Sequence, residues 1–457
     1  MALSQIDAAA ANLGKFLQIV YSNGTIGQLS EDHRDWEMVS KQKVSDEAAR
    51  AINFMVQKSF GVPAVQWSKQ GSGGSFPTSS QSTHEELSAG FNQLYSTVEL
   101  EYDLWQRALG SPHKYAEPLA IEIQSKGVVQ KRLLSAAFHL DGTGDFGTLS
   151  ASALSSGDGQ FTFSAGGARY MEYGDRFSVV NVDGTLVDIA AGSGTVTDSW
   201  YEVVDKSREN NTVTCQLYGT SAAVTFVEAT HGITGPLTVG DRFIRFGSTA
   251  VDKSGTYFTA GSLEVNDMAE IMPGLPSLTA NDGRKLHGMT MSGITSGTKY
   301  TASGAVDISH LQAGMDKLKT ITGEGVNKYK QVLSAPETLA AFIESQETDR
   351  RLVNINDNKR GQKGFGYIHN NDTLELVTSE FNADASMWCI PEGSKQSGIL
   401  ELHGKDFVEV KAGSQGEFLK ASGSGGYSPY IQKFMMAYMT LICKRPNAIL
   451  EINGFTN

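Results

Sequence analysis

Residues 177–188 show the pattern in this sequence that most suggests catalytic chemistry: a hydrophobic strand ending in Asn181-Val182-Asp183-Gly184-Thr185. Two carboxylates at such a strand end, one a nucleophile and the other a general acid/base, can cleave a phosphate ester beside Mg²⁺. Here Asn181 stands at the nucleophile position, and an amide can neither form an acyl phosphate nor give the metal a negative ligand. Asp183-Gly184 is typical of a hairpin turn between two strands, so the pattern predicts a turn.

The same segment resembles the first motif of haloacid-dehalogenase-type phosphatases, in which a helix follows the catalytic strand. The residues that follow here are rich in Gly, Ser and Thr and predict further strands instead. A phosphatase built on residues 181–188 is nevertheless an alternative. Mg²⁺-dependent hydrolysis of a phosphate ester, abolished by Asp183→Ala, would reveal it.

Other clusters of chemically capable residues also have simpler interpretations. The acidic loop at 141–145 lacks the alternating ligands and the distal Glu of an EF-hand and predicts a helix C-cap. His84 and Glu85 begin like a zinc-protease helix, but Ser88 stands where the second His is required. The sequence has no G-x-S-x-G motif and no P-loop. We therefore predict no catalytic, cofactor-binding or metal-binding residues, no cofactor and no enzyme activity.

The charge of the chain argues against sequence-reading binding of DNA. Its 457 residues include 50 acidic and 38 basic ones, for a net charge of −12, so there is no basic field to hold nucleic acid tightly. The short basic run at 359–363 is typical of a solvated turn. Cys215, Cys389 and Cys443 are far apart in sequence and predict partly buried, reduced thiols rather than a disulfide framework or a zinc site.

The N-terminus does not have the pattern of a secretory signal. Residues 1–21 are only mildly apolar and include Asp7 and Lys15. No window of the chain reaches 18 uncharged apolar residues, the minimum for a membrane helix. These features predict a protein that is made and kept in the cytosol, without membrane contact.

Forty-nine glycines against eleven prolines, between many short apolar runs, predict a large β content. The best helical pattern covers 116–140, where apolar residues mostly recur at three- or four-residue steps. Further helices are predicted at 307–320 and behind a capping box at 334–337. We expect an α+β unit from 329 to about 425. Strand patterns lie at 329–333, 373–377, 387–390, 399–402, 407–410, 430–443 and 448–452.

The first hundred residues predict an arm followed by a loop. Weakly amphipathic stretches at 6–20 and 45–58 indicate helical pieces in an extended arm. Strand patterns at 64–67 and 92–102 flank a Gly/Ser-rich tip at 70–83, which predicts a long hairpin-like loop.

Residues 161–267 predict an inserted all-β domain, with short strands at 176–182, 212–217, 223–227 and 242–246. An internal echo lies within it: Tyr-Gly-Asp-Arg-Phe at 173–177 and Val-Gly-Asp-Arg-Phe at 239–243. Gly-Asp leading into an aromatic strand is a turn pattern, so two copies predict two related hairpins of one small barrel.

This order of elements resembles the Hong Kong 97-type major capsid proteins of tailed bacteriophages. The likeness covers nearly the whole chain and is carried by loose motifs. These are Leu94-Tyr95, Leu-Trp-Gln-Arg-Ala at 104–108, Ala-Ala-Phe-His-Leu-Asp-Gly-Thr-Gly at 136–144, Gly-Tyr-Ile-His-Asn-Asn-Asp-Thr-Leu at 366–374, and Arg-Pro-Asn-Ala-Ile-Leu-Glu-Ile at 445–452.

The resemblance implies an α+β Hong Kong 97-like capsid fold with an inserted all-β domain. Some members crosslink a loop Lys to an Asn of a neighbour. Lys69 lies in the matching loop, but no partner Asn can be identified. The implied divisions are an N-terminal arm at 1–58, an extended loop at 59–99, a peripheral domain with a spine helix at 100–160, an inserted β-barrel-like domain at 161–267, the peripheral domain continued at 268–330, an axial domain at 331–425, and closing strands at 426–457.

The implied function is that of a shell subunit. Copies of the chain would assemble into hexamers and pentamers of an icosahedral head that encloses double-stranded DNA without reading its sequence. Portal, scaffolding and cement proteins are the implied partners, and the implied location is the virion, assembled in the host cytoplasm. An encapsulin-like bacterial compartment shell is the alternative with the same fold, and copurified DNA rather than an enzyme cargo would separate the two.

Overall fold

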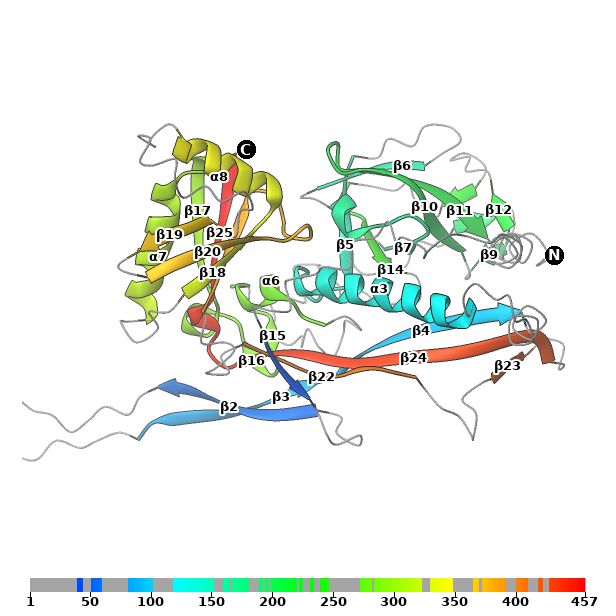
Figure 1. Cartoon of the computed structure of the whole chain (residues 1–457), viewed down its shortest axis with the longest axis horizontal. Helices are drawn as coiled ribbons and strands as arrows, with labels where there is room; N and C mark the ends of the chain where they lie inside the picture. Colours follow the sequence, from blue (N-terminus) through cyan, green and yellow to red (C-terminus); the bar gives the residue numbers. More distant parts are fainter. Residues whose placement is uncertain are drawn as a thin grey trace, which may run out of the picture.

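The computed structural model describes most of the chain as a mixture of helices and strands (Figure 1). No described helix is both long and apolar enough to cross a membrane. The described residues are 39–43, 51–59, 81–101, 118–151, 159–164, 167–180, 189–191, 194–196, 199–219, 222–224, 231–233, 239–245, 272–281, 283–322, 329–347, 365–369, 372–391, 400–409, 418–421 and 427–456.

Helix α3 (Pro118–Phe138) confirms the long helix predicted at 116–140. Its C-terminal turns bury Leu134 and Phe138, which contribute to the largest apolar cluster of the described chain. The helix stops at the predicted cap, because Gly142 and Gly144 adopt φ values of 77° and 85° that only glycine takes readily. Asp141 accepts a hydrogen bond from the Thr143 amide at 3.0 Å, so this acidic loop is a turn.

The long strand β24 (Tyr427–Cys443) is the centre of a five-stranded sheet in the described chain, and α3 runs along this sheet (Figure 1). The strands predicted at 92–102 and 430–443 are confirmed. The strands predicted at 399–402 and 407–410 are confirmed as strand, but they form one continuous strand, β22. A register shift between Lys405 and Val408 interrupts the apolar pattern there without ending the strand. The partners are β4 (Asn92–Glu101), β22 (Leu400–Glu409) and β23 (Phe418–Ala421), all antiparallel to β24, and β1 (Ser40–Lys43), parallel to β22.

A two-stranded hairpin is formed by β2 (Ala51–Ser59) and β3 (Thr83–Gly90). The helical piece predicted at 45–58 is therefore wrong, since Phe54 and Val56 are buried and Met55 between them is exposed, a period of two residues. In the described chain β2 and β3 lie on either side of the Gly/Ser-rich segment, whereas the strand predicted at 92–102 pairs with β24. The predicted pieces at 6–20 and 64–67, and most of the tip at 70–83, lie outside the described residues.

A six-stranded sheet with helices α7 (Ile308–Thr322) and α8 (Pro336–Glu347) forms a second body, called here the α/β unit. Helix α7 lies very close to β25, because a Cβ on Gly314 would be 2.9 Å from the Ile452 side chain. Both helices and four predicted strands are confirmed. In order, the strands are β17 (Thr298–Ala305), β25 (Leu450–Thr456), β21 (Ser386–Pro391), β18 (Tyr329–Ser334), β20 (Asp372–Thr378) and β19 (Phe365–His369).

Two expectations for the α/β unit are corrected. It was predicted to span 329 to about 425, but β17 and β25 join its sheet from outside that range, whereas β22 and β23 pair with β24. The capping box at 334–337 is also wrong. The Ser334 hydroxyl is buried without a hydrogen-bond partner in the described structure. The Ser334 carbonyl instead accepts the Ser379 amide at 3.0 Å.

Six strands of the described chain form a closed ring, called here the barrel. The order is β10-β7-β14-β5-β6-β11, and the ring closes through the pairing of β10 with β11. Aromatic side chains fill it, with the rings of Phe161 and Phe243 edge to face at 4.9 Å. The strands are β5 (Asp145–Ala151), β6 (Gly159–Phe163), β7 (Arg176–Val180), β10 (Ser199–Ser207), β11 (Thr212–Gly219) and β14 (Arg242–Arg245), with β12 (Ala222–Val224) beside β11. Strands β5 and β6 place the start of the barrel before residue 161, because both pair within the ring.

The ring consists of two copies of one three-stranded unit. β5, β6 and β7 correspond to β10, β11 and β14, and exchanging the two sets leaves the ring order unchanged. The first pairing of each copy has the same irregularity: a register shift falls between Leu149 and Ala151 in β5, and between Val203 and Asp205 in β10. β7 pairs with β14 about Ser178 and Ile244, which are equivalent residues of the two copies.

The Gly-Asp echo occupies equivalent places in the two copies. In each turn the glycine amide donates to a strand carbonyl, and the amide of that strand residue donates back to the aspartate carbonyl. The echo is therefore the visible part of a structural repeat. The two sets are Gly174, Val203 and Asp175, at 2.9 and 3.0 Å, and Gly240, Leu149 and Asp241, at 2.9 and 2.8 Å.

Short elements complete the described chain. They are the helix α6 (Leu275–Leu278), the hairpin of β15 (Lys285–Leu286) and β16 (Met289–Thr290), the small sheet of β13 (His231–Ile233), β8 (Ile189–Ala191) and β9 (Gly194–Val196), and the 3-10 turns η2 (Gly167–Tyr170), η3 (Gly293–Thr295) and η6 (Pro446–Ala448).

Candidate functional site at the junction of three bodies

The residues that the sequence offered for chemistry do not assemble into a reactive site in the described structure. Residues 181–188, Lys69 and the basic run at 359–363 lie outside the described residues. His84 and Glu85 belong to strand β3 and not to a zinc-binding helix. Within the described residues, no group of three or more His, Cys, Asp or Glu side chains could hold a metal ion.

The three cysteines are buried and free, in line with the predicted reduced thiols. Burial raises the pKa of Cys389 and of Cys443 to about 12, because the thiolate would be poorly solvated. Burial raises the pKa of Cys215 as well. None of these thiols is therefore set up as a nucleophile.

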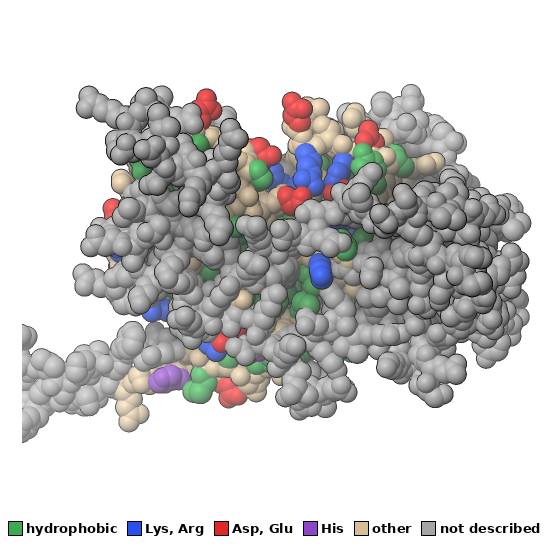
Figure 2. All heavy atoms as spheres, viewed as in Figure 1, with side chains coloured by type: hydrophobic (Ala, Val, Ile, Leu, Met, Phe, Trp, Pro, Cys, Tyr) green, Lys and Arg blue, Asp and Glu red, His purple; other side chains and the backbone are tan. Residues whose placement is uncertain are grey.

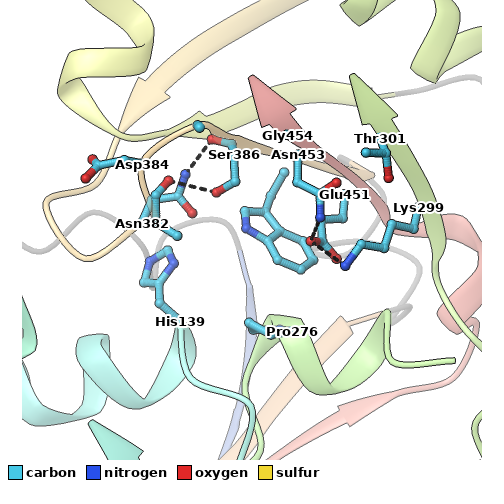
Figure 3. A pocket seen from close by; sticks show the side chains of 13 residues that line it. His139, Pro276, Lys299, Thr301, Asn382, Asp384, Ser386, Glu451, Asn453 and Gly454 are labelled. Carbon is cyan, nitrogen blue, oxygen red and sulfur yellow. Dashed lines mark hydrogen bonds and ion pairs between the residues drawn. The ribbon is translucent and has the colours of Figure 1, made fainter. Parts of the chain in front are cut away.

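A cleft of about 520 Å³ lies where the end of α3 meets the α/β unit (Figure 3). His139 follows α3, Lys299 comes from β17, and Glu451 comes from β25. The loop between β20 and β21, residues 379–385, forms another wall and is called here the junction loop. Residues so distant in sequence meet because β25, from the end of the chain, lies between β17 and β21 in the sheet.

The charged groups of the cleft neutralise one another. The Glu451 carboxylate accepts hydrogen bonds from the Asn453 amide at 2.8 Å and from the Thr279 hydroxyl, and pairs with Lys299 at 3.2 Å. Asp384 pairs with Arg169 of the barrel at 2.5 Å. With these partners the carboxylates act as structural contacts and not as acids or bases toward a substrate.

Ser379 and His139 form the contact that most resembles a catalytic pair, with 3.1 Å between the hydroxyl oxygen and Nε2. Both side chains are buried, and the Ser379 hydroxyl also accepts the Phe381 amide at 3.3 Å. A nucleophile must reach its substrate, so this pair is better suited to joining the junction loop to α3. The sequence could not indicate the pair, because its members lie 240 residues apart.

A second cluster joins α3 to the barrel. Arg132 of α3 donates to Asp175 at 2.7 Å, and Arg245 of β14 donates to the other Asp175 oxygen at 2.9 Å. Burial by itself raises the pKa of Asp175, but Arg245 and Arg132 outweigh it, so the pKa lies below its usual value. The arrangement neutralises a buried carboxylate and offers no free acid.

The comparisons with known proteins find shell proteins. No protein-family model matches the chain, and no curated protein matches it. Among solved structures, it is similar to the cyanophage A-1(L) capsid asymmetric unit, with a TM-score of 0.49 and 9% identity over 96% of this chain and 98% of that one. It is also similar to the capsid of a native GTA particle, with a TM-score of 0.46 and 10% identity over 98% and 99% of the two chains.

A third similar structure is the SrpI encapsulin of Synechococcus elongatus PCC 7942, with a TM-score of 0.41 and 8% identity over 98% of this chain and 95% of that one. Two of the three are capsids and one is an encapsulin.

Proposed function

We propose that the chain is the major capsid protein of a tailed bacteriophage. Its copies assemble into hexamers and pentamers of an icosahedral head that encloses the double-stranded DNA genome. The observation that carries this proposal is the hairpin of β2 and β3. One face of this hairpin is buried against the subunit, and the other face is exposed.

The inner face of the hairpin packs against the subunit through Phe54, Val56 and Leu87, all at most 7% exposed. On the outer face Met55 is 64% exposed. In the described chain β2 and β3 pair only with each other, and a two-stranded hairpin is marginally stable in water by itself. Figure 1 shows the hairpin at the lower edge of the molecule, away from the barrel. Such an element fits a role of reaching onto a neighbouring copy.

The proposed division of the subunit follows the strand pairings. The hairpin, residues 51–90, corresponds to the extended loop, α3 to the spine helix, and the sheet around β24 to the peripheral domain. The α/β unit corresponds to the axial domain, with β17 and β25 included. The barrel, which starts at β5 and returns through β14, corresponds to the inserted domain, and residues 1–50 correspond to the arm.

The charge of the chain suits a container for DNA. A wall with a net charge of −12 repels phosphates, so packaged DNA is enclosed without being held tightly. Portal and scaffolding proteins, and a cement protein on the shell, are the partners that such a head requires. The proposed location is the virion, after assembly in the host cytoplasm.

The hairpin gives a direct test through Met55→Glu, with Val239→Glu as the matched control. Both parent side chains are exposed, at 64% and 65%. Residue 55 faces Glu86 across the hairpin, so Met55→Glu should lower the thermal stability of the free subunit slightly, and Val239→Glu should leave it unchanged. We expect Met55→Glu to abolish the formation of shells and capsomers seen by electron microscopy, because a charge enters an apolar contact. Val239→Glu, on the barrel, should assemble normally. Unchanged assembly of Met55→Glu would refute this role of the hairpin.

A further inference from the structure

We propose that the barrel braces the subunit: it fixes the angle between helix α3 and the α/β unit. The brace is a property of the single subunit, and only its consequence for a shell rests on the proposed function. It consists of three contacts that join three bodies in a closed triangle. These bodies are α3, the barrel and the α/β unit with its junction loop.

The first contact is the insertion of Phe381 from the junction loop into the core of the barrel. Phe381 is 1% exposed and belongs to the apolar cluster of the barrel strands. Its ring stacks on Tyr170 of η2, with centroids 6.4 Å apart and planes at 10°. The α/β unit is therefore joined to the barrel by a buried side chain, in an apolar cluster that the barrel shares with the end of α3.

Ion pairs flank the inserted ring. Arg169 pairs with Asp384 at 2.5 Å, and Arg208 of the β10–β11 turn pairs with Glu380 at 3.2 Å. Figure 2 shows acidic and basic side chains beside one another on this face of the molecule. The two ion pairs hold the junction loop to the surface of the barrel on either side of Phe381, and the stack on Tyr170 holds the Phe381 ring in the apolar cluster.

The second contact joins the barrel to α3 through Arg132 and Asp175. The short segment from Arg169 to Asp175 therefore touches both other bodies. Its first two residues bind the junction loop, and its last residue binds the helix. The segment is itself held to the barrel, because Asp175 also binds Arg245 of β14 at 2.9 Å.

The third contact is the hydrogen bond between Ser379 and His139, which joins the junction loop directly to the end of α3. The loop is stiffened from within, since the Asn382 side chain donates to the Ser386 carbonyl at 2.9 Å. It is also held to α8, where the Thr338 hydroxyl accepts the Ala385 amide at 3.1 Å. Helix α3 and the α/β unit also share one apolar cluster, to which α3 contributes Phe138 and the α/β unit contributes Trp388. With three sides closed, a turn of α3 against the α/β unit must break a barrel contact in addition to shifting this shared packing.

The brace can be tested with two spin labels on the full-length, unassembled subunit. Lys131 on α3 and Glu337 on α8 are exposed, so Lys131→Cys with Glu337→Cys accepts the labels, and the three native thiols are buried. The variants are Phe381→Ala, and Glu380→Gln combined with Asp384→Asn. The control is Phe342→Ala, which removes a buried ring from the α/β unit alone.

Pulsed electron paramagnetic resonance then measures the distance between the labels. We expect a single narrow distance distribution in the parent and in Phe342→Ala, even though the latter lowers the melting temperature. Both junction variants should broaden the distribution and add longer distances. A parent-like distribution in either junction variant would overturn the brace.

The design separates the brace from loss of folding and from the shell proposal. Should Phe381→Ala not fold, the double carboxamide variant decides alone, because its parent carboxylates are 34% and 45% exposed and the change preserves their shape. Distances are read on free subunits, so a chain that never assembles still tests the brace. Conversely, junction variants that keep a narrow, parent-like distribution would refute the brace and leave the capsid proposal intact.

Discussion

Arg132 and Asp175 form an ion pair of 2.7 Å whose two side chains are only 6% and 7% exposed. Removing one partner leaves the other charge buried, so Asp175→Asn should lower the free energy of unfolding by about 3–5 kcal/mol at pH 7. Asp205→Asn, at an exposed site of the same barrel, should change it by less than about 0.5 kcal/mol. Urea unfolding of the two variants measures the difference.

The same pair predicts a pH dependence. The pKa of Asp175 is lowered in the folded chain, so its contribution is complete above its ordinary value near 4 and is lost as the pH falls through the folded pKa. The gap between the parent and Asp175→Asn should therefore shrink on acidification below about pH 4. A gap that is equally large at neutral and at strongly acidic pH would contradict this assignment.

His287, beside strand β24, predicts a second pH dependence. Burial lowers its pKa to about 4, and the neutral ring donates to the Leu441 carbonyl at 2.9 Å. Between pH 6.5 and 4 this histidine binds a proton in the unfolded chain but not in the folded one. The free energy of unfolding of the parent should therefore fall by up to roughly 3 kcal/mol across this range. His287→Asn, which tolerates the φ of 55°, should lose that slope, and the exposed His84→Asn should keep it. Denaturant unfolding over this pH range is the measurement. Equal slopes in all three proteins would show that His287 is not the group responsible.

Gly274 lies against the end of α3 with no room for a side chain. A Cβ there would be 2.4 Å from the Ala137 and Phe138 carbonyl oxygens and 2.5 Å from that of Leu140. Gly274→Ala should therefore destabilise the subunit strongly, by about 3 kcal/mol or more, because backbone atoms must move. Gly90→Ala has open space and is the control. Thermal unfolding that ranks the two variants equally would contradict the close contact.

The repeat within the barrel predicts equal responses at its two turns. Gly174 and Gly240 have φ values of 78° and 104°, and at Gly174 the space around the missing Cβ is open. Gly174→Ala and Gly240→Ala should each lower the free energy of unfolding by about 1–2 kcal/mol, because alanine is strained at positive φ. Chemical unfolding of both variants checks this. A cost at one turn and none at the other would show that the turns are not equivalent.

The sequence predicted the elements better than their partners. Helix α3 was visible because its apolar residues recur at helical steps and glycines follow it. The barrel turns were visible because Gly-Asp was repeated. In contrast, β2 resembled a weak helix, although Ile52, Phe54 and Val56 lie on one face of the strand. Local pattern is also silent about which sheet a strand joins, so β22 was placed in the α/β unit and β25 was left outside it.

The junction was beyond prediction for the same reason. Phe381 and Tyr170 are more than two hundred positions apart and look like ordinary loop aromatics in the sequence. The closed barrel and the position of β25 within its sheet bring the two rings and their flanking charges together. The chemistry-like motif at 181–188 drew attention because motifs are local, whereas packing contacts of this kind are not.

Negative-stain electron microscopy with size-exclusion chromatography of the purified full-length chain tests the central claim most directly. The capsid proposal predicts closed shells, hexamers or curved sheets, with DNA rather than an enzyme cargo in particles isolated from the natural source. A chain that stays a compact monomer under all conditions, with or without a scaffolding protein, would contradict it.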